Sequence, residues 1–496
     1  MLLTHMIRDG AQRYPSHRAV QFAQDTLTFC EVDAYSTGMG LRLADKLPPG
    51  AMVGLLAGNG LMSMPLDFAC AKARLVRVPL NPRLSVAEHE AMLRRANVTS
   101  LVHSQDQRER ALALCGAIPE LELIDLGALS KGADAQAGNL SEPSSDDPVL
   151  ALFTSGTTGR LKAVVHSQAT YGAVVLNILT NLVDPRPADS LLHAASLFHA
   201  SGTLLLPYWL RGGAAAVLPG FDPESYLEAL EQWRPTALML VPTMLNLLLD
   251  HTGFAATRFG SVDTIIYGAS PMPRPLIERA LAELGPRFVQ FYGQTEAPLA
   301  IASLGKEDHL NSRHLTSCGR PAREAEVRVD APPGEEGEVL VRAPFGMVGY
   351  YDEPELTAET ITADGWIRTR DIGRFEPDGL LRLVDRASDM IVTGGYNVYP
   401  KEVEDVLLQH PAVREAAVVG VPDTKWGEAV LAFVVLRAGA AADADTLRMH
   451  CQERLARYKA PKDVKFSDSL PTSAVGKPLR RVLREPYWSG LDRRVG

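Results

Sequence analysis

Residues 154–162 constrain the fold and chemistry of this chain more than any other segment. They follow an apolar run at residues 149–153, which predicts a buried strand. In order they are Thr154, Ser155, Gly156, Thr157, Thr158, Gly159, Arg160, Leu161 and Lys162. Glycines let backbone N–H groups approach an anion, hydroxyls add donors, and the lysine adds a mobile positive charge. A strand that ends in this loop suits a polyphosphate, and a flexible surface turn is the alternative.

The loop is not a Walker motif, because the spacing G-x-x-x-x-G-K-[ST] cannot be aligned to it. Around it, strand-like and helix-like segments alternate. Residues 51–57 and 75–80 are predicted strands, and residues 62–73 between them are a predicted buried helix. This βαβ rhythm predicts a parallel sheet covered by helices. Residues 131–147 are rich in small and polar residues and predict an exposed loop.

The rest of the chain predicts three further regions. Residues 190–285 form a second strand–helix series, with strands at 237–241 and 264–267. From about residue 324 the sequence pattern changes to short predicted strands, at residues 326–329, 337–342 and 379–384. Short strands of this kind favour a small antiparallel or barrel-like unit. A final α+β segment follows, with helices at 401–409 and 446–458 and strands at 415–421 and 429–436. We expect an α/β protein with a large domain at residues 1–387 and a smaller one at 388–496.

Composition excludes several classes of protein. The 496 residues carry a formal net charge of −9, whereas nucleic-acid binders usually show a basic balance. No apolar stretch reaches the ~18 residues of a membrane span, and residues 1–9 lack a secretory signal pattern. The five cysteines contain no C-x-x-C pair, so they predict neither a zinc site nor a disulfide framework. We therefore expect a cytoplasmic protein without a nucleic-acid partner or stable membrane insertion.

A second motif follows the strand-like run at residues 288–291. It holds Tyr292, Thr295 and Glu296. A hydroxyl beside a carboxylate at a strand end can hold a phosphate and Mg²⁺, because this ion is usually bound by one or two carboxylates plus substrate phosphates. A solvated Thr-Glu pair in a loop is the alternative.

A third motif places Asp371 after Arg370, with Asp385 and Arg386 further along. A carboxylate at a strand end can accept both hydroxyls of a ribose. The alternatives are a turn residue for Asp371 and a surface ion pair of little energetic value for Arg386.

Two more motifs occupy the smaller domain. Gly394 and Gly395 open it, and paired glycines let a backbone pass close to a thin ligand or simply form a turn. Lys477 lies on a glycine-containing loop near the C-terminus, where a lysine is normally just solvated.

These five motifs, in this order, resemble the adenylate-forming superfamily of acyl-CoA synthetases, adenylation domains and luciferases. The resemblance spans about residues 4–484 and is closest to bacterial acyl-CoA synthetases for fatty or aromatic acids. It implies that a carboxylate attacks the α-phosphate of ATP, giving an acyl-adenylate and pyrophosphate. A thiol, that of coenzyme A, then attacks the acyl carbon and releases AMP. Joining two anions requires positive charge and donors where charge accumulates.

The resemblance assigns nucleotide-binding roles. Residues 154–162 would hold the β- and γ-phosphates, Thr295 would contact the α-phosphate, and Glu296 would bind Mg²⁺. Asp371 and Arg386 would hold the ribose. Tyr292 belongs to the same nucleotide-binding set.

The resemblance also implies that the smaller domain alternates between two orientations about a hinge at Ser388. One orientation brings Lys477 between the carboxylate and the α-phosphate. The other withdraws it and brings Gly394 and Gly395 forward to form the tunnel for the pantetheine arm.

The acid should lie beside His199, which in relatives stands where the acid and thiol sites meet; a helix-start histidine without a ligand is the alternative. Residues 241–248 would supply another wall. The backbone of Gly268, Ala269 and Ser270 should face the adenine. These linings are small or apolar and hold no obvious arginine for a second carboxylate, so we expect a monocarboxylic acid.

Four positions depart from the family pattern. Leu161 replaces the usual Pro, Ala163 the usual Gly, and Ser388 the usual Asp or Lys. Arg370 replaces the usual Gly before Asp371, which sets a long cation beside the expected ribose site. It could contact a phosphate of coenzyme A or point to solvent.

The leading hypothesis is an ATP-dependent acyl-CoA ligase with a small-molecule acid, ATP and coenzyme A as partners. The alternative is a stand-alone enzyme that loads an acyl group onto a carrier protein. Luciferase-like oxidation and a catalytically silent binding protein are weaker alternatives. A homodimer is left open.

Overall fold

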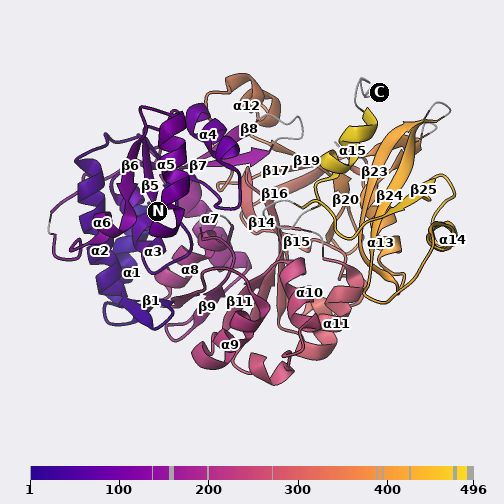
Figure 1. The fold of residues 1–496 in the computed structure, drawn as a ribbon, viewed down its shortest axis with the longest axis horizontal. Coiled ribbons are helices and arrows are strands. Elements are labelled where there is room, and N and C mark those ends of the chain that lie inside the picture. The colour runs from indigo at the N-terminus through magenta and orange to yellow at the C-terminus, as the bar shows by residue number, and fades with distance from the viewer. Residues whose placement is uncertain are drawn as a thin grey trace.

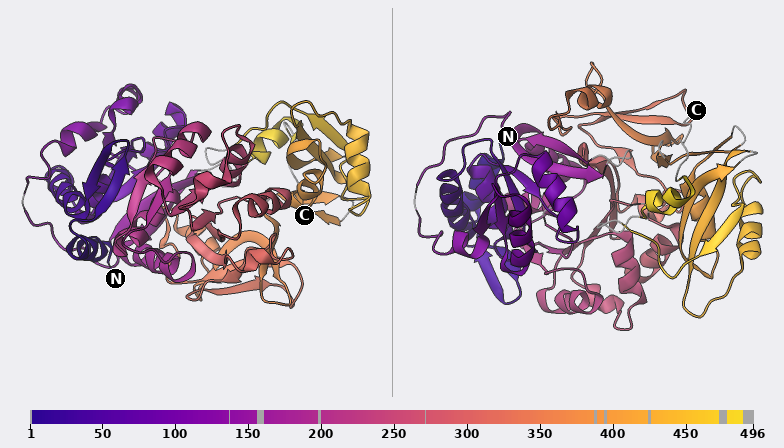
Figure 2. Two further views of the ribbon diagram at one scale, coloured as in Figure 1. Left: turned by 90° about the horizontal axis from the view of Figure 1, so that it is seen from below. Right: turned by 45° about the horizontal axis from the view of Figure 1, so that its top comes forward.

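The computed structural model describes residues 2–136, 138–155, 161–197, 200–270, 272–386, 389–393, 396–423, 426–472 and 478–488. Figures 1 and 2 show a large body formed by the first three quarters of the chain, and a separate lobe, orange to yellow, at one end beside β20 (Leu381–Arg386) and α11 (Arg274–Leu284). No helix in the described part of the chain is long and apolar enough to cross a membrane.

One sheet of the body carries the first predicted βαβ unit. Its strands are β3 (Met52–Leu56), β4 (Val76–Pro79), β5 (Ser100–His103), β6 (Glu122–Asp125), β7 (Pro148–Ser155), β8 (Leu161–Ser167) and β18 (Gly349–Tyr350). They pair in the order β18-β8-β7-β4-β3-β5-β6, parallel from β7 to β6. Buried apolar strands of this kind need helices on both faces. The predicted strands at 51–57 and 75–80 match β3 and β4, while the pairing of β8 with β7 and β18 was not predicted.

The other sheet of the body is longer. Its strands are β1 (Arg18–Phe22), β2 (Asp25–Thr28), β9 (Ser190–His193), β10 (Ala214–Val217), β11 (Ala237–Leu240), β12 (Thr264–Tyr267), β13 (Phe288–Gln294), β14 (Ala297–Leu304) and β15 (Arg320–Pro321). The order is β15-β14-β13-β12-β11-β9-β10-β1-β2, with a parallel centre from β13 to β1. The carboxyl ends of parallel strands meet at one edge, where ligands of α/β sheets bind.

Helices cover these sheets. They are α1 (Leu3–Arg13), α2 (Phe29–Ala44), α3 (Ser63–Lys72), α4 (Val86–Arg95), α5 (Arg108–Ala117), α6 (Leu126–Ser130), α7 (Gln168–Asn181), α8 (Leu205–Leu210), α9 (Pro223–Trp233), α10 (Pro242–Asp250), α11 and α12 (Pro354–Thr360), with short 3₁₀ turns at Gln105–Gln107, Ala200–Leu204, Ala256–Phe259 and Asp308–Leu310. Several begin where the sequence supplies a capping box, as at Thr28 and Glu31. Residues 131–136 and 138–147 form neither helix nor strand, as predicted.

The core that joins the two sheets centres on Trp209. Its ring stacks on Phe29 with centroids 4.2 Å apart and meets the edge of Phe68 at 5.0 Å. Its indole N–H donates to the carbonyl of Ile7 at 2.9 Å. Elements from the first 70 residues are thereby bound to α8, and this cluster packs strands of both sheets together, while further apolar clusters fill the rest of the body.

A small antiparallel sheet follows, as predicted. It contains β16 (Glu326–Asp330), β17 (Gly337–Arg342), β19 (Ile367–Phe375) and β20 in that order. In β19 the register shifts, because Leu340 faces Arg368 whereas Glu338 faces Ile372. Residues 369–371 therefore bulge opposite Val339 alone.

The lobe at the end of the chain has its own core. Its strands are β21 (Ile391–Thr393), β22 (Tyr396–Val398), β23 (Val413–Asp423), β24 (Gly427–Leu436) and β25 (Asp463–Phe466), and its helices are α13 (Pro400–Leu407), α14 (Ala444–Gln452) and α15 (Arg480–Trp488). Most of their buried apolar side chains form one cluster within residues 391–464, and a smaller cluster around Ala417, Val435 and Leu470 packs against Leu483 of α15. The predicted helix at 446–458 was too long, since α14 ends at Gln452 and turns lead on to Pro461.

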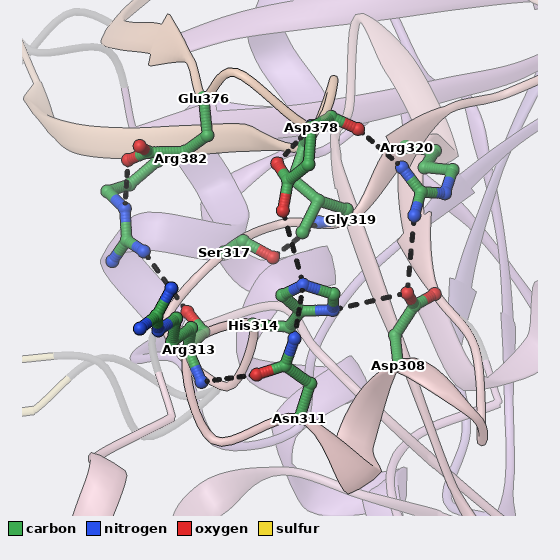
Figure 3. A network of polar contacts seen from close by, with 11 residues as sticks. Asp308, Asn311, Arg313, His314, Ser317, Gly319, Arg320, Glu376, Asp378 and Arg382 are labelled. Atoms are coloured by element: carbon green, nitrogen blue, oxygen red, sulfur yellow. Dashed lines mark hydrogen bonds and ion pairs between the residues drawn. The ribbon is translucent and has the colours of Figure 1, made fainter.

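A network of polar contacts beneath β20 ties the small antiparallel sheet to the loop before β15 (Figure 3). His314 lies between Asp308 and Asp378, with nitrogen–oxygen distances of 3.3 and 3.2 Å. Arg382 on β20 pairs with Glu376 at 2.6 Å and also contacts Thr316. The network fixes the strand that leads to the C-terminal lobe.

Candidate active site

The predicted phosphate loop connects two antiparallel strands. Thr154 on β7 is paired with Lys162 on β8, and Ser155 with Leu161. Gly156, Thr157, Thr158 and Gly159 lie outside the described residues, as does the side chain of Ser155. The hydroxyl of Thr154 is buried and has no hydrogen-bond partner within the described ranges. An orphaned donor at the mouth of this loop fits an incoming phosphate oxygen.

Lys162, Glu296 and Tyr350 form the centre of the site. Lys162 Nζ donates to Glu296 Oε1 at 2.9 Å and to the Tyr350 hydroxyl at 2.6 Å. The same hydroxyl donates to Glu296 Oε1 at 2.7 Å, and the ammonium lies 4.3 Å from the tyrosine ring centroid. The lysine and glutamate side chains are only 18% and 10% exposed. A buried pair of this kind persists only when well bonded.

Electrostatics keep Glu296 ionised. Burial acts to raise its pKa, but the Lys162 charge and the bonds from Tyr350 and Lys162 outweigh burial, so the pKa is lowered. The pKa of Tyr350 is raised by burial and by the Glu296 charge, so its proton stays in place.

This carboxylate fits the predicted magnesium role. Both bonds fall on Oε1, which leaves Oε2 without a side-chain donor among the described residues. An ionised carboxylate with a free oxygen can hold Mg²⁺ when substrate phosphates complete the coordination.

Backbone contacts hold the Thr295–Glu296 turn between β13 and β14. His166 on β8 contacts the carbonyl of Thr295 through Nε2 at 2.9 Å, and Met347 N–H donates to the carbonyl of Glu296 at 2.8 Å. Burial lowers the pKa of His166 to about 4, so the ring is neutral at physiological pH. Both motif residues therefore lie at a strand end, as predicted.

The predicted ribose carboxylate lies close by. The Tyr292 hydroxyl donates to Asp371 Oδ2 at 2.6 Å, and both side chains are buried. Burial and the Asp371 charge raise the pKa of Tyr292 far above its usual value. The backbone of Arg386 pairs with that of Asp371, whereas its side chain lies outside the described residues. The expectation of a strand end or turn at Asp371 was wrong, because the residue sits in the bulge within β19.

The predicted adenine segment follows β12. A Cβ on Gly268 would lie 2.6 Å from the carbonyl oxygen of Phe291, so only glycine fits there without movement. Ala269 has a φ of +63°, and Ser270 is half-buried. The turn lies at the carboxyl edge of the parallel sheet, where ligands of α/β sheets bind.

His199, Ser388, Gly394, Gly395 and Lys477 lie outside the described residues. On either side of His199 in the sequence, His193 and Ser201 are in contact, with His193 Nδ1 2.8 Å from the Ser201 hydroxyl. Burial lowers the pKa of His193 to about 3, and its Nε2 is buried without a partner in the described part of the chain.

Reasoning from sequence missed Tyr350, His166 and His193. Tyr350 enters the site because β18 pairs with β8 across more than 180 positions of the chain. Isolated histidines and a tyrosine in a short strand carry no local signal of this kind, so no pattern in the sequence indicated them.

The chain belongs to the AMP-binding enzyme family. The model described as AMP-binding enzyme matches residues 7–351, more than half of the chain, and the AMP-binding enzyme C-terminal domain matches residues 402–477. The predicted resemblance to adenylate-forming enzymes is confirmed.

Similar proteins with assigned names show which enzymes of this family the chain resembles. The chain is 38% identical over 480 residues to the medium/long-chain-fatty-acid–CoA ligase FadD8 of Mycobacterium tuberculosis, covering 90% of this chain and 83% of that one. It is 37% identical over 489 residues to a feruloyl-CoA synthase of an Amycolatopsis species, covering 96% and 97%. The amide bond synthetase McbA from Marinactinospora thermotolerans matches with a TM-score of 0.89 at 32% identity, covering 98% and 99%. The predicted α/β fold class is confirmed.

Proposed function

We propose that this protein is an ATP-dependent, AMP-forming acid–thiol ligase that makes acyl-CoA from a monocarboxylic acid. One observation carries the proposal: Lys162, on the strand that follows the phosphate loop, forms a buried ion pair with the ionised Glu296, and Glu296 lies just after Tyr292, whose hydroxyl bonds to Asp371. This arrangement offers a cation and a metal-binding carboxylate beside a hydroxyl-binding carboxylate, which together suit a nucleoside triphosphate.

In the first step the acid's carboxylate oxygen forms a bond to the α-phosphorus of ATP, and the bond to the β-phosphate breaks. Lys162 would supply positive charge to the leaving pyrophosphate, and Thr295 would contact the α-phosphate. Glu296 would hold Mg²⁺, which neutralises phosphate charge when bound. Asp371, fixed by Tyr292, would accept the ribose hydroxyls and so orient the α-phosphorus.

In the second step the thiol sulfur of coenzyme A forms a bond to the acyl carbon, and AMP leaves. We propose domains at 1–387 and 388–496, with a hinge at Ser388 that exchanges Lys477 for Gly394 and Gly395. The independent core of the terminal lobe supports this division. Arg480, three positions after Lys477, pairs with Glu404 at 2.7 Å and with Asp389 at 3.0 Å, so this part of the tail is tied to the lobe.

The acid itself is proposed only as a class. Two of the relatives named above are a medium/long-chain-fatty-acid–CoA ligase and a feruloyl-CoA synthase. The segments expected to line the pocket are small or apolar, in keeping with a fatty or aromatic monocarboxylate. His199 is proposed to stand where acid and thiol meet. A cytoplasmic location and a homodimer stay predictions.

The first test supplies ATP, Mg²⁺, coenzyme A and a panel of short, medium and long fatty acids, benzoates and cinnamates. We expect AMP and pyrophosphate in equal amounts with an acyl-CoA. ADP and phosphate as products would contradict the proposal. Parallel reactions with a carrier protein or an amine as acceptor distinguish the alternative acyl acceptors.

The second test separates the two steps. Lys477→Ala should reduce acid-dependent ATP–pyrophosphate exchange by about 10²- to 10³-fold, because the joining of two anions loses its bridging cation. Thioester formation from a supplied acyl-adenylate should change far less. Equal losses in both steps would contradict the role given to Lys477.

A further inference from the structure

Arg370 adopts a backbone conformation that arginine rarely takes. Its φ is +60°, in the left-handed region that favours glycine. The residue occupies the middle of the bulge at 369–371 in β19. Non-glycine residues persist in this region only where surrounding structure holds them, and they cluster at functional sites.

Hydrogen bonds from neighbouring residues hold this bulge in place. The N–H of Arg370 donates to Glu338 Oε1 at 3.0 Å, and Arg368 donates to Glu338 Oε2 at 3.0 Å. The Thr369 hydroxyl donates to the carbonyl of Val339 at 2.6 Å and accepts from the N–H of Asp371 at 3.1 Å. The polar groups of the bulge are thus bonded on both sides of Arg370, which fixes where its side chain starts.

The guanidinium of Arg370 differs from those of its neighbours. Arg368 and Arg374 on the same strand, and Arg382 on the next, all pair with carboxylates. Arg370 is exposed, and within the described residues its guanidinium has no hydrogen bond or ion pair. A cation whose backbone is fixed and whose side chain has no partner among the described residues is available to a ligand.

That ligand is expected on the nucleotide side. Arg370 immediately precedes Asp371, whose carboxylate binds Tyr292, and the strand of Tyr292 leads directly to Glu296. The Arg370 charge is also felt at the Tyr350 hydroxyl, where it acts to lower a pKa that burial and Glu296 raise. Arg370 therefore adjoins the Tyr292–Asp371 pair in the chain and lies within electrostatic reach of Tyr350 in the Lys162–Glu296–Tyr350 cluster.

We propose that Arg370 binds a phosphate group of the substrate and thereby adds a second cation, with Lys162, around the polyphosphate of ATP. This inference rests on the proposed function. Coenzyme A also carries phosphates, and the experiment distinguishes these two sources. A guanidinium suits phosphate because its planar fork can donate two parallel hydrogen bonds.

The test uses three variants. Arg370→Gln removes the charge, and Arg370→Gly removes the side chain while relieving the backbone conformation. Arg342→Gln is the matched control, because it removes one exposed arginine from the same sheet, where the residue pairs with Glu326. Arg370→Gly should melt no lower than wild type, which excludes loss of folding as the cause of any change.

The readout is acid-dependent ATP–pyrophosphate exchange without coenzyme A. Both Arg370 variants should raise the KM for ATP by about tenfold, as expected for the loss of one charge-assisted hydrogen bond, and Arg342→Gln should leave it unchanged. In the complete reaction, the KM values for coenzyme A and dephospho-coenzyme A should stay as in wild type. An unchanged KM for ATP, or an effect confined to coenzyme A, would overturn the proposal.

Direct binding of ATP separates this inference from the proposed function. If wild type binds ATP but performs no exchange with any acid, the proposed function fails, and the affinities of wild type and Arg370→Gln still decide the role of Arg370. Equal affinities would refute it.

Discussion

Two polar clusters of this molecule use the same kinds of side chain for different purposes. At the candidate site, one buried carboxylate oxygen of Glu296 accepts hydrogen bonds from both Lys162 and Tyr350. The buried hydroxyl of Thr154, on the strand paired with that of Lys162, lacks a partner in the described ranges. In the network of Figure 3, His314 lies between Asp308 and Asp378, and Arg382 is bonded to Glu376 and Thr316.

Each cluster has one buried polar atom without a hydrogen bond among the described residues, Thr154 Oγ1 in the site and His314 Nδ1 in the network, so the two clusters differ in where their charged groups are bonded. The network joins two sheets and uses its charges on itself. Within the described residues, the site keeps the Thr154 hydroxyl, the second carboxylate oxygen of Glu296 and the Arg370 guanidinium without partners, the first two at or beside strand ends and the third in the bulge of β19.

The largest effect should come from Glu296→Gln. The amide keeps the shape but loses the charge that pairs with Lys162 and would bind Mg²⁺. We expect the rate of AMP formation to fall by about 10²- to 10³-fold while the protein stays folded. A rate within threefold of wild type would place the metal-binding role elsewhere.

A smaller effect is expected from Tyr292→Phe. The change removes the hydroxyl that donates to Asp371, and hydrogen bonds to charged groups contribute about 1.5–3 kcal/mol. Asp371, the carboxylate proposed to bind the ribose, would lose its orientation, so the KM for ATP should rise by about tenfold in the exchange assay. An unchanged KM would show that Asp371 is held without Tyr292.

Arg382→Ala should have the opposite effect: it should lower the stability of the protein and leave its activity unchanged. It removes contacts to Glu376 and Thr316, so unfolding in urea should require about 1–2 kcal/mol less free energy. The KM for ATP and the rate per folded molecule should stay within twofold of wild type. A catalytic defect without a loss of stability would mean that the network serves the site.

The smallest effect is a pH dependence. The folded-state pKa of Glu296 lies below its ordinary value of 4.5, so its stabilising contribution is present above that value and is lost as pH falls through the folded pKa. The stability gap between wild type and Glu296→Gln should therefore narrow on acidification. Glu326→Gln is the control: its pKa is lowered by the bond from exposed Arg342, so its contribution should vanish in high salt while that of Glu296 persists. A gap that does not depend on pH would contradict this ionisation.

Local patterns were enough for much of this protein. Buried strands such as β3, β4 and β12 were predicted because continuous apolar runs bounded by turn residues have few other solutions. Thr295 and Glu296 were correctly placed at a strand end for the same reason. The family and its reaction class followed from motifs that are short, ordered along the chain and readable without a partner.

Long-range pairing decided the rest. Tyr350 reaches Lys162 and Glu296 only because β18 joins β8, and Asp371 sits in a bulge only because Val339 of β17 faces three residues of β19. Register depends on the whole sheet, so no local window of sequence contains it. The sequence alone identified the residues proposed to bind a nucleotide. Their burial, their hydrogen bonds and the exposed position of Arg370 depend on the pairing of strands that are distant in the sequence.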